Sequence, residues 1–239
     1  MKPPEIQLPE GMLPRFGETP EQVAVALADA VAEVLEARLA QAPRASLVVS
    51  GGSTPLPFFK ALSEKALDWQ RVDVLLADER WVAEDDPASN TQLVKAHLLQ
   101  GKAAAANYLS LKQQGATPLE GLKAVKAELA NLALPLDVLI LGMGNDGHTA
   151  SLFPDAPELA DAISADCPDR VAAATPPSQS QQRITLTWPA LKDARFTALH
   201  LKGQDKLETL EQALANPSDV MAMPVRAFLQ PGLNVFWSP

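Results

Sequence analysis

The feature that most constrains the fold is an apolar segment that runs directly into a glycine-rich loop. Residues 136–141 (LDVLIL) are almost continuously apolar and include β-branched side chains. Such a pattern is typical of a strand buried on both faces of a parallel sheet. Gly142, Gly144 and Gly147 follow, and His148 comes directly after them. Ligands of open α/β sheets bind beyond the carboxyl ends of the strands, so the sequence predicts a ligand site at this loop.

The rest of the chain alternates between strand and helix patterns. This rhythm predicts an α/β fold with a mostly parallel sheet and helices on both of its faces, with no internal repeat and no clear domain boundary. Helices are predicted over residues 20–42, 90–99, 117–132 and 204–215. Strands are predicted over residues 46–49, 72–77, 136–141, 183–188 and 196–201, with further candidates at 6–12, 108–111, 170–175 and 233–237.

The composition narrows the classes of partner. The chain has 239 residues, with 20 Lys and Arg against 29 Asp and Glu, which gives a net charge of −9. Nucleic acids and anionic membranes require a basic footprint, so neither is expected as a partner. A phosphorylated small molecule remains compatible with this charge if a few cations gather locally.

Cysteine content and terminal patterns give further expectations. The single cysteine, Cys167, excludes an internal disulfide and a cysteine metal cluster. We expect no metal site, since no HExxH-like spacing occurs either. The first residues lack the order of a signal peptide, and no run approaches the roughly 18 apolar residues of a membrane helix. We therefore expect a cytoplasmic protein.

His148 is the first candidate for catalysis. A lone histidine is more often structural, but this one lies in a glycine loop at a strand end, and histidine titrates near neutrality. Asp146 is positioned to orient its ring, although an aspartate in such a loop is also an ordinary turn former. His97 falls within a predicted helix and His200 within a predicted strand, so both are interpreted as packing or surface residues.

A second loop has the composition of an anion site. Residues 50–55 (SGGSTP) follow a short buried strand and precede a helix. Free backbone N–H groups and the helix dipole favour an anion there, and the alternative is a plain glycine-serine turn. Basic residues that could offset the acidic balance locally lie near strand ends or helix starts, namely Arg80, Arg183, Lys202 and Lys206.

Several other reaction classes match less well. Gly142, Gly144 and Gly147 have the spacing of a dinucleotide fingerprint, but Phe153-Pro154 interrupts the expected helix and no acidic strand end follows at the usual distance. Residues 50–55 lack the lysine of a P-loop, and no Gly-x-Ser-x-Gly nucleophile elbow is present.

Taken together, these segments resemble the 6-phosphogluconolactonase family. The resemblance is carried, in the family's order, by SGGSTP (50–55), DERW (78–81), SN (89–90), GMGNDGHTASLFP (142–154) and RITLTWPAL (183–191). It implies a single Rossmann-like three-layer α/β/α domain over residues 1–239. It also implies hydrolysis of 6-phosphoglucono-δ-lactone to 6-phosphogluconate in the oxidative pentose phosphate pathway, with no cofactor and with a monomer or homodimer as the assembly.

The resemblance also assigns roles to residues. It implies that His148 is the general base that activates water, with Asp146 as its orienting partner. Gly51, Gly52, Ser53 and Thr54 resemble the phosphate loop, which Arg183 and Lys206 would assist. Arg80 resembles the arginine of the lactone pocket, where it would bind phosphate or stabilise the oxyanion. A δ-lactone is an activated ester, so a positioned water, one base and oxyanion stabilisation suffice.

Two alternatives stay open from the sequence. The related glucosamine-6-phosphate deaminases share the glycine phosphate loop and the Asp-Gly-His core. The deaminases carry tyrosine where this chain has Arg80, and a functional glutamate where it has Phe153. Because of these two differences, the deaminase reaction is ranked below lactone hydrolysis for this chain. A non-catalytic sugar-phosphate sensor on the same fold is the other alternative, and the retention of both His148 and Asp146 speaks against it.

Overall fold

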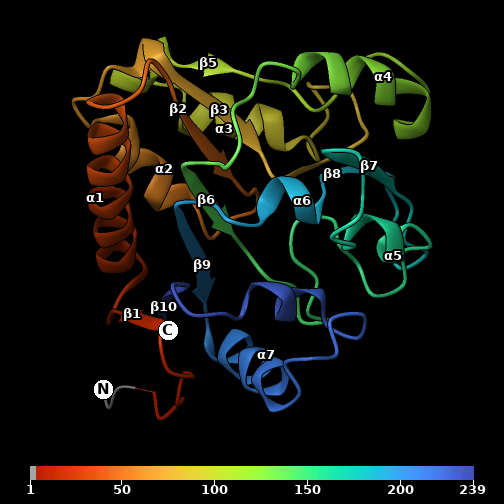
Figure 1. The fold of residues 1–239 in the computed structure, drawn as a ribbon. Helices are drawn as coiled ribbons and strands as arrows, with labels where there is room; N and C mark the ends of the chain where they lie inside the picture. The colour runs from red at the N-terminus through yellow and green to blue at the C-terminus, as the bar shows by residue number, and fades with distance from the viewer. Residues whose placement is uncertain (1–3) are drawn as a thin grey trace.

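The structure, a computed structural model, describes residues 4–239 and is built around a parallel sheet of seven strands (Figure 1). The strand order is β1-β10-β9-β6-β2-β3-β5, and every neighbouring pair is parallel. The strands comprise β1 (Leu13–Phe16), β2 (Ala45–Val49), β3 (Val72–Leu76), β5 (Asn107–Tyr108), β6 (Val138–Leu141), β9 (Phe196–Lys202) and β10 (Asn234–Ser238). The predicted α/β fold with a mostly parallel sheet is confirmed.

The helices follow from caps and apolar stripes in the sequence. The longest, α1 (Pro20–Leu39), begins at Thr19, whose side chain accepts a hydrogen bond from the Gln22 N–H, and buries a stripe that includes Leu27 and Val31. With α2 (Leu56–Ser63), α1 covers one side of the large sheet (Figure 1). The remaining helices are α3 (Asn90–His97), α4 (Pro118–Glu128), α5 (Leu159–Ala162), α6 (Trp188–Leu191) and α7 (Gln204–Ala215), with short 3-10 turns at Trp69–Arg71, Gly101–Ala105 and Pro224–Phe228.

A second, smaller sheet was not predicted. It is antiparallel, in the order β4-β8-β7, and comprises β4 (Asp78–Arg80), β7 (Val171–Ala174) and β8 (Arg183–Leu186). The predicted strand at residues 72–77 is thus followed directly by a further strand, β4, that belongs to the other sheet. Ala77 links the two sheets, because its N–H donates to the Val49 carbonyl of β2 and its carbonyl accepts from the Leu186 N–H of β8.

Some predicted element boundaries were wrong. The candidate edge strand at residues 6–12 is irregular, and β1 begins only at Leu13. The first helix ends at Leu39 rather than near residue 42, α4 ends at Glu128 rather than near 132, and His97 is the last residue of α3. Propensity and caps place an element well, but its last turn depends on packing that the sequence pattern does not encode.

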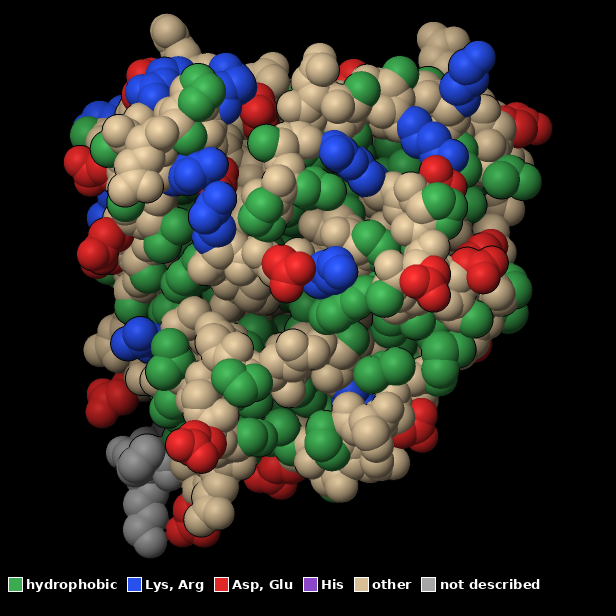
Figure 2. All heavy atoms as spheres, viewed as in Figure 1, with side chains coloured by type: hydrophobic (Ala, Val, Ile, Leu, Met, Phe, Trp, Pro, Cys, Tyr) green, Lys and Arg blue, Asp and Glu red, His purple; other side chains and the backbone are tan. Residues whose placement is uncertain are grey.

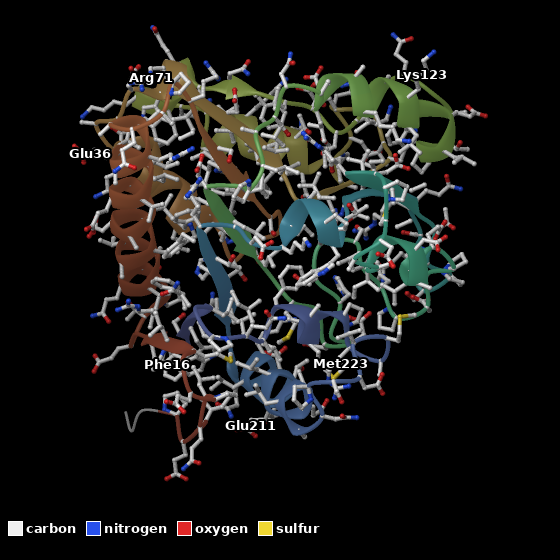
Figure 3. All side chains as sticks on the ribbon, viewed as in Figure 1. Phe16, Glu36, Arg71, Lys123, Glu211 and Met223 are labelled. Atoms are coloured by element: carbon white, nitrogen blue, oxygen red, sulfur yellow. The ribbon has the colours of Figure 1, made fainter. Side chains whose placement is uncertain are left out.

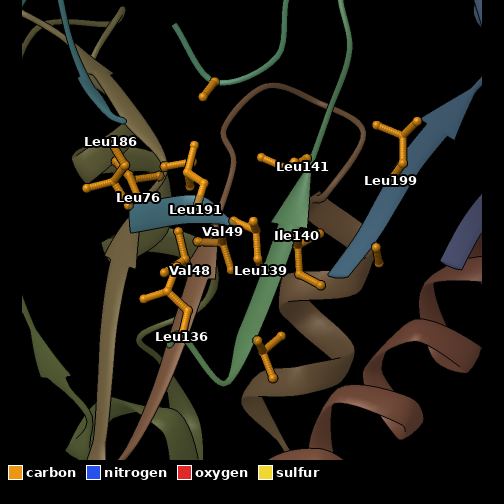
Figure 4. Packing of buried hydrophobic residues seen from close by; sticks show 14 of the residues in the cluster. Val48, Val49, Leu76, Leu136, Leu139, Ile140, Leu141, Leu186, Leu191 and Leu199 are labelled. Atoms are coloured by element: carbon orange, nitrogen blue, oxygen red, sulfur yellow. The ribbon is translucent and has the colours of Figure 1, made fainter. Parts of the chain in front are cut away.

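The core is centred on β6. Its residues Leu139, Ile140 and Leu141 pack between Val48 of β2 and Leu199 of β9, and all are at most 2% exposed (Figure 4). Buried apolar side chains of the small sheet belong to the same core cluster. Of the helices in residues 4–239, none is long and apolar enough to cross a membrane.

The strand order reverses direction between β2 and β6. From β2 the chain continues to β3 and β5 on one side, whereas from β6 it continues to β9 and β10 on the other. At such a switch point the loops after the two strands separate and leave a crevice. The Ser50 hydroxyl donates to the Ile140 carbonyl (2.9 Å) and ties the two strand ends together at the base of this crevice.

Candidate active site

A pocket of about 370 Å³ lies at this switch point. Its walls come from the loop after β2, the loop after β6, the end of β9, the first turn of α7 and the small sheet. The predicted site residues that line it are Gly51, Gly52, Ser53, Thr54, Arg80, His148, Arg183 and Lys206. Asp146 lies behind His148, so the structure brings the whole predicted set together.

The ring of His148 is fixed by a carboxylate. Its Nδ1 lies 2.5 Å from Asp146 Oδ1, and the same oxygen accepts the backbone N–H of His148 at 2.9 Å. An ionised carboxylate only accepts hydrogen bonds, so the ring proton sits on Nδ1 and Nε2 carries a lone pair. Burial opposes the ionisation of Asp146, but the hydrogen bonds from the His148 ring and backbone outweigh it and hold the pKa of Asp146 below its ordinary 3.8.

An aromatic ring sets the plane of the imidazole. Phe153 is fully buried and stacks on His148, with 4.1 Å between ring centroids and 22° between ring planes. The guanidinium carbon of Arg183 also lies 5.3 Å from the centroid of the Phe153 ring. Phe153 therefore contacts both the candidate base, His148, and the candidate anion-binding residue Arg183. Its rigid ring helps to hold both side chains in place.

The loop after β6 needs glycine where His148 folds back over it. A Cβ at Gly144 would lie 2.1 Å from His148 Cε1, which no real contact allows. The loop is closed by hydrogen bonds from the Gly144 N–H to the His148 carbonyl (3.0 Å) and from the Thr149 hydroxyl to the Gly142 carbonyl (2.7 Å). No long helix follows, because the next helix, α5, has four residues. This agrees with the interpretation that the glycine spacing is not a dinucleotide fingerprint.

The loop after β2 presents unused donors. Among the described residues, the N–H groups of Gly51, Gly52, Ser53 and Thr54 find no hydrogen-bond partner. Gly51 is also packed closely, because a Cβ there would lie 2.2 Å from the Asn90 side chain. Successive free N–H groups at the start of a helix suit an anion.

Two arginines reach the pocket from the small sheet. Arg80 of β4 and Arg183 of β8 are directly paired across the strands, so their side chains emerge side by side. Arg80 donates to the Ala88 carbonyl (2.9 Å) and Arg183 to Gln179 Oε1 (3.0 Å), while the Nε atom of each is buried without a partner among the described residues. Burial lowers the pKa of Arg183, which Asp78 opposes, and Arg80 lowers it further.

The charge balance inside the pocket is the reverse of that of the chain. Arg80, Arg183, Lys202 and Lys206 line it, and the one carboxylate among its lining residues is Asp78, whose Oδ2 lies 3.9 Å from Arg183 Nη1. Asp78 is partly engaged elsewhere, since it accepts the Ser151 hydroxyl at 2.5 Å. A chain with a net charge of −9 therefore concentrates cations at this one cavity, which suits an anionic ligand. On the face shown in Figure 2, by contrast, basic and acidic side chains are interspersed.

Sequence reasoning missed two residues that position the arginines and the loop. Glu79 is 1% exposed and accepts N–H groups from Arg80 (2.8 Å), Asn90 (2.9 Å) and Thr91 (2.7 Å). Burial raises the pKa of Glu79, and these hydrogen bonds oppose the rise. Asn90, whose side chain lines the pocket against Gly51, is the first residue of α3. The available signal was an acidic residue, Glu79, that follows closely after the apolar run at residues 72–77.

The C-terminal part of the chain supports the His148 loop. The Val225 N–H donates to the Gly147 carbonyl (2.9 Å), and Met223 packs against Gly147 beside α7 (Figure 3). Lys206 Nζ donates to Asn145 Oδ1 (2.9 Å). Among residues 4–239, no group of three or more His, Cys, Asp or Glu side chains is arranged to hold a metal ion.

Comparison with known proteins agrees with this geometry. The sequence model described as glucosamine-6-phosphate isomerases/6-phosphogluconolactonase matches residues 18–237. The chain belongs to this family. Among curated relatives, the 6-phosphogluconolactonase of Pseudomonas aeruginosa is 47% identical over 98% of both chains. That of Rhizobium meliloti is 41% identical over 93% of this chain and 97% of its own.

The fold of the family is shared as well. A crystal structure of a 6-phosphogluconolactonase from Shewanella baltica OS155 superposes with a TM-score of 0.93 and 41% identity, covering 98% of this chain and all of the other. The resemblance drawn from the sequence is therefore confirmed at the level of family and fold. The family includes both lactonases and isomerases, so the reaction itself depends on the site.

Proposed function

We propose that the chain hydrolyses 6-phosphoglucono-δ-lactone to 6-phosphogluconate, as a cytoplasmic enzyme of the oxidative pentose phosphate pathway. The observation that carries the proposal is the Asp146–His148 pair, which leaves a basic Nε2 at a pocket lined by four cationic side chains. Relatives named 6-phosphogluconolactonase at 47% and 41% identity over nearly the whole chain support it.

The reaction needs a base, a bound phosphate and a stabilised oxyanion. His148 Nε2 takes a proton from water as the water oxygen bonds to the lactone carbonyl carbon, and Asp146 stabilises the resulting imidazolium. Arg80 lies in the pocket as a donor for the oxyanion of the tetrahedral intermediate. The bond between the carbonyl carbon and the ring oxygen then breaks, and His148 returns its proton to that oxygen. The products are a hydroxyl group and a carboxylic acid, which ionises.

We assign the phosphate to the loop after β2 and to the basic side chains of the pocket near it. The free N–H groups of Gly51 to Thr54 would bind its oxygens, and Arg183 and Lys206 would supply charge. The isomerase reaction of the same family is less well supported, because proton transfer through an open-chain amino sugar needs a further carboxylate. The position next to His148 is filled instead by the ring of Phe153. We also infer that residues 1–239 form one domain, which the core shared by the two sheets supports.

The decisive test compares the wild type with His148→Ala. Freshly generated 6-phosphoglucono-δ-lactone is supplied and the rate is corrected for spontaneous ring opening. We expect fast turnover by the wild type and a loss of roughly 10²–10⁴-fold in the variant, which is the usual contribution of a general base, with substrate binding retained. Activity close to wild type in the variant would remove His148 from the mechanism. A wild type that releases ammonia from glucosamine 6-phosphate and leaves the lactone intact would establish the isomerase alternative.

A further inference from the structure

His200 lies on the wall of the pocket, although its sequence context indicates a packing residue. It belongs to β9, between Leu199 and Leu201, and is 7% exposed. Its place on the wall follows from register, because Leu199 pairs with Leu141 and His200 therefore lies level with the point where β6 gives way to the loop at Gly142. A titratable group is thus built into the sheet at the edge where the ligand is expected.

The fold holds the ring but leaves its polar atoms unused. Phe58 of α2 contacts the His200 ring edge to face, with 6.2 Å between centroids and 83° between planes. Nδ1 is buried without a hydrogen-bond partner, and Nε2 forms no hydrogen bond with any described residue. Buried polar groups in native proteins are rarely left without partners, so each such group needs an explanation. A ligand in the pocket would explain this one.

The environment selects one protonation state. Burial lowers the pKa of His200 to about 4, so the imidazole is neutral at physiological pH. A buried nitrogen lone pair without a partner costs less than a buried N–H without one. The bare nitrogen is therefore Nδ1, and the proton is on Nε2. His200 presents to the pocket a neutral hydrogen-bond donor.

Its position indicates which end of the ligand it meets. Phe58, which holds the ring, is in the helix that follows the Gly51–Thr54 loop. On the other side, β9 continues from His200 to Lys202, and Lys206 follows in α7. His200 thus lies between the two elements that we assign to phosphate binding, and a phosphate dianion only accepts hydrogen bonds.

We propose that His200 is a substrate-binding residue whose Nε2–H donates a hydrogen bond to a phosphate oxygen of the bound sugar phosphate. This inference rests on the proposed function for the identity of the ligand. A neutral donor suits this place, because it adds a hydrogen bond without adding a further positive charge beside Lys202 and Lys206. It also explains why a histidine stands between the buried residues Leu199 and Leu201.

The test compares His200→Leu, which removes the donor, with His200→Gln, whose amide N–H reaches the place of Nε2. We expect His200→Leu to raise KM for 6-phosphoglucono-δ-lactone and the dissociation constant of inorganic phosphate by the same factor, about 10- to 100-fold, with a smaller change in kcat. His200→Gln should recover most of the loss. His97→Leu, which alters an exposed histidine at the end of α3, is the matched control and should leave both constants unchanged.

A folded His200→Leu variant with unchanged affinity for inorganic phosphate would overturn the proposal. Phosphate affinity is measured by calorimetry, independently of turnover. If the wild type binds phosphate but does not hydrolyse the lactone, the proposed function fails while the inference on His200 is still decided.

A second measurement needs no substitution at His200. The imidazole nitrogens of the wild type are observed by nitrogen-15 NMR, and the chain contains only three histidines, so His97→Leu and His148→Ala identify the remaining signals. We expect Nδ1 of His200 to be unprotonated and Nε2 protonated, with the Nε2–H signal shifting when inorganic phosphate is added. Protonation at Nδ1, or no response to phosphate, would contradict the proposal.

Discussion

The two sheets supply the pocket in different ways. Apart from His200 and Lys202 of β9, the large parallel sheet supplies loops beyond its strand ends, where the His148 side chain is 28% exposed and a Cβ added to Gly52 would meet no atom within 4 Å. The small antiparallel sheet supplies side chains from within its strands, and that of Arg183 is 6% exposed. Groups at the loops stay accessible to water, which a base that activates water requires. Cations in the strands are desolvated, and they attract an anion more strongly for that reason.

The largest effect on activity is expected in the loop after β6, for the substitution Asp146→Asn. The asparagine oxygen can still accept a hydrogen bond, but the imidazolium formed during the reaction loses its carboxylate, and the ring loses its fixed orientation. We expect kcat to fall about 10²-fold with little change in KM, in line with the cost of misplacing a catalytic group. Steady-state kinetics check this, with Asp166→Asn as an exposed control. A kcat within twofold of wild type would separate Asp146 from the chemistry.

The next prediction compares how much two basic residues contribute to ligand binding, namely the buried Arg183 of β8 and the more exposed Lys206 of α7. Arg183→Ala should weaken the binding of 6-phosphogluconate by about 10- to 100-fold, because a desolvated charge-assisted contact is lost. Lys206→Ala should weaken it by no more than about fivefold, because Lys206 is only partly buried and its charge is screened by solvent. Calorimetry at low and high salt measures both, and the Lys206 effect should shrink more at high salt. Equal losses for the two variants at both salt concentrations would show that the desolvated Arg183 and the more exposed Lys206 contribute alike.

The third prediction concerns stability on the small-sheet side. Glu79→Gln replaces an oxygen that accepts the Thr91 N–H with an amide donor, and we expect it to lower the free energy of unfolding by about 1–3 kcal/mol. Urea unfolding followed by fluorescence and circular dichroism measures this, with one cooperative transition expected. Glu36→Gln, an exposed residue of α1 labelled in Figure 3, is the control.

The pH dependence of Glu79 has a definite sign. Because burial raises its pKa in the folded state above the ordinary 4.5, the folded protein binds more protons than the unfolded chain just above that pH. The contribution of Glu79 to the free energy of unfolding therefore falls as pH rises through this window. This contribution should be absent in Glu79→Gln, so the slope of the free energy of unfolding against pH should differ between the two proteins in this window. If the free energy of unfolding depends on pH in the same way in both proteins, the pKa of Glu79 is not raised by folding.

The sequence predicted the large sheet and its loops because their signals are local. The apolar run at residues 136–141 predicts strand β6, and the glycines after it predict the loop that follows. The cap at Thr19 predicts the start of α1. The loop after β2 was predicted from its own residues in the same way. Two strands of the small sheet were predicted, at residues 170–175 and 183–188, but their pairing with residues 78–80 in a separate antiparallel sheet was not, because β4 is only three residues long. The pairing of Arg80 with Arg183 depends on long-range register, which no local pattern encodes.

The residues of the candidate site were named from the sequence one by one, and the pocket brings them together, but the contacts that support them were not predicted. His148, Asp146 and the anion loop stand out as polar or glycine-rich segments after strands. His200 was missed because it stands between two leucines, where a histidine is interpreted as a packing residue, and Glu79 because it lies between Asp78 and Arg80 in a short charged segment. Their significance appears only once the fold shows what surrounds them, such as the N–H groups of α3 around Glu79 and the pocket beside His200.

The pairing of β1 with β10 has a consequence for the order in which the chain becomes functional during synthesis. Among residues 4–239, the strand Leu13–Phe16 pairs in the sheet only with Asn234–Ser238, and the Gly147 carbonyl accepts the N–H of Val225. A ribosome adds about 5–20 residues per second, so β1 leaves the exit tunnel on the order of ten seconds or more before its neighbour exists. Until residues 225–238 have emerged, the strand Leu13–Phe16 has an unpaired edge and the His148 loop lacks the hydrogen bond from Val225. A nascent chain stalled before residue 225 is thus expected to carry the chemical groups of the site without their final arrangement.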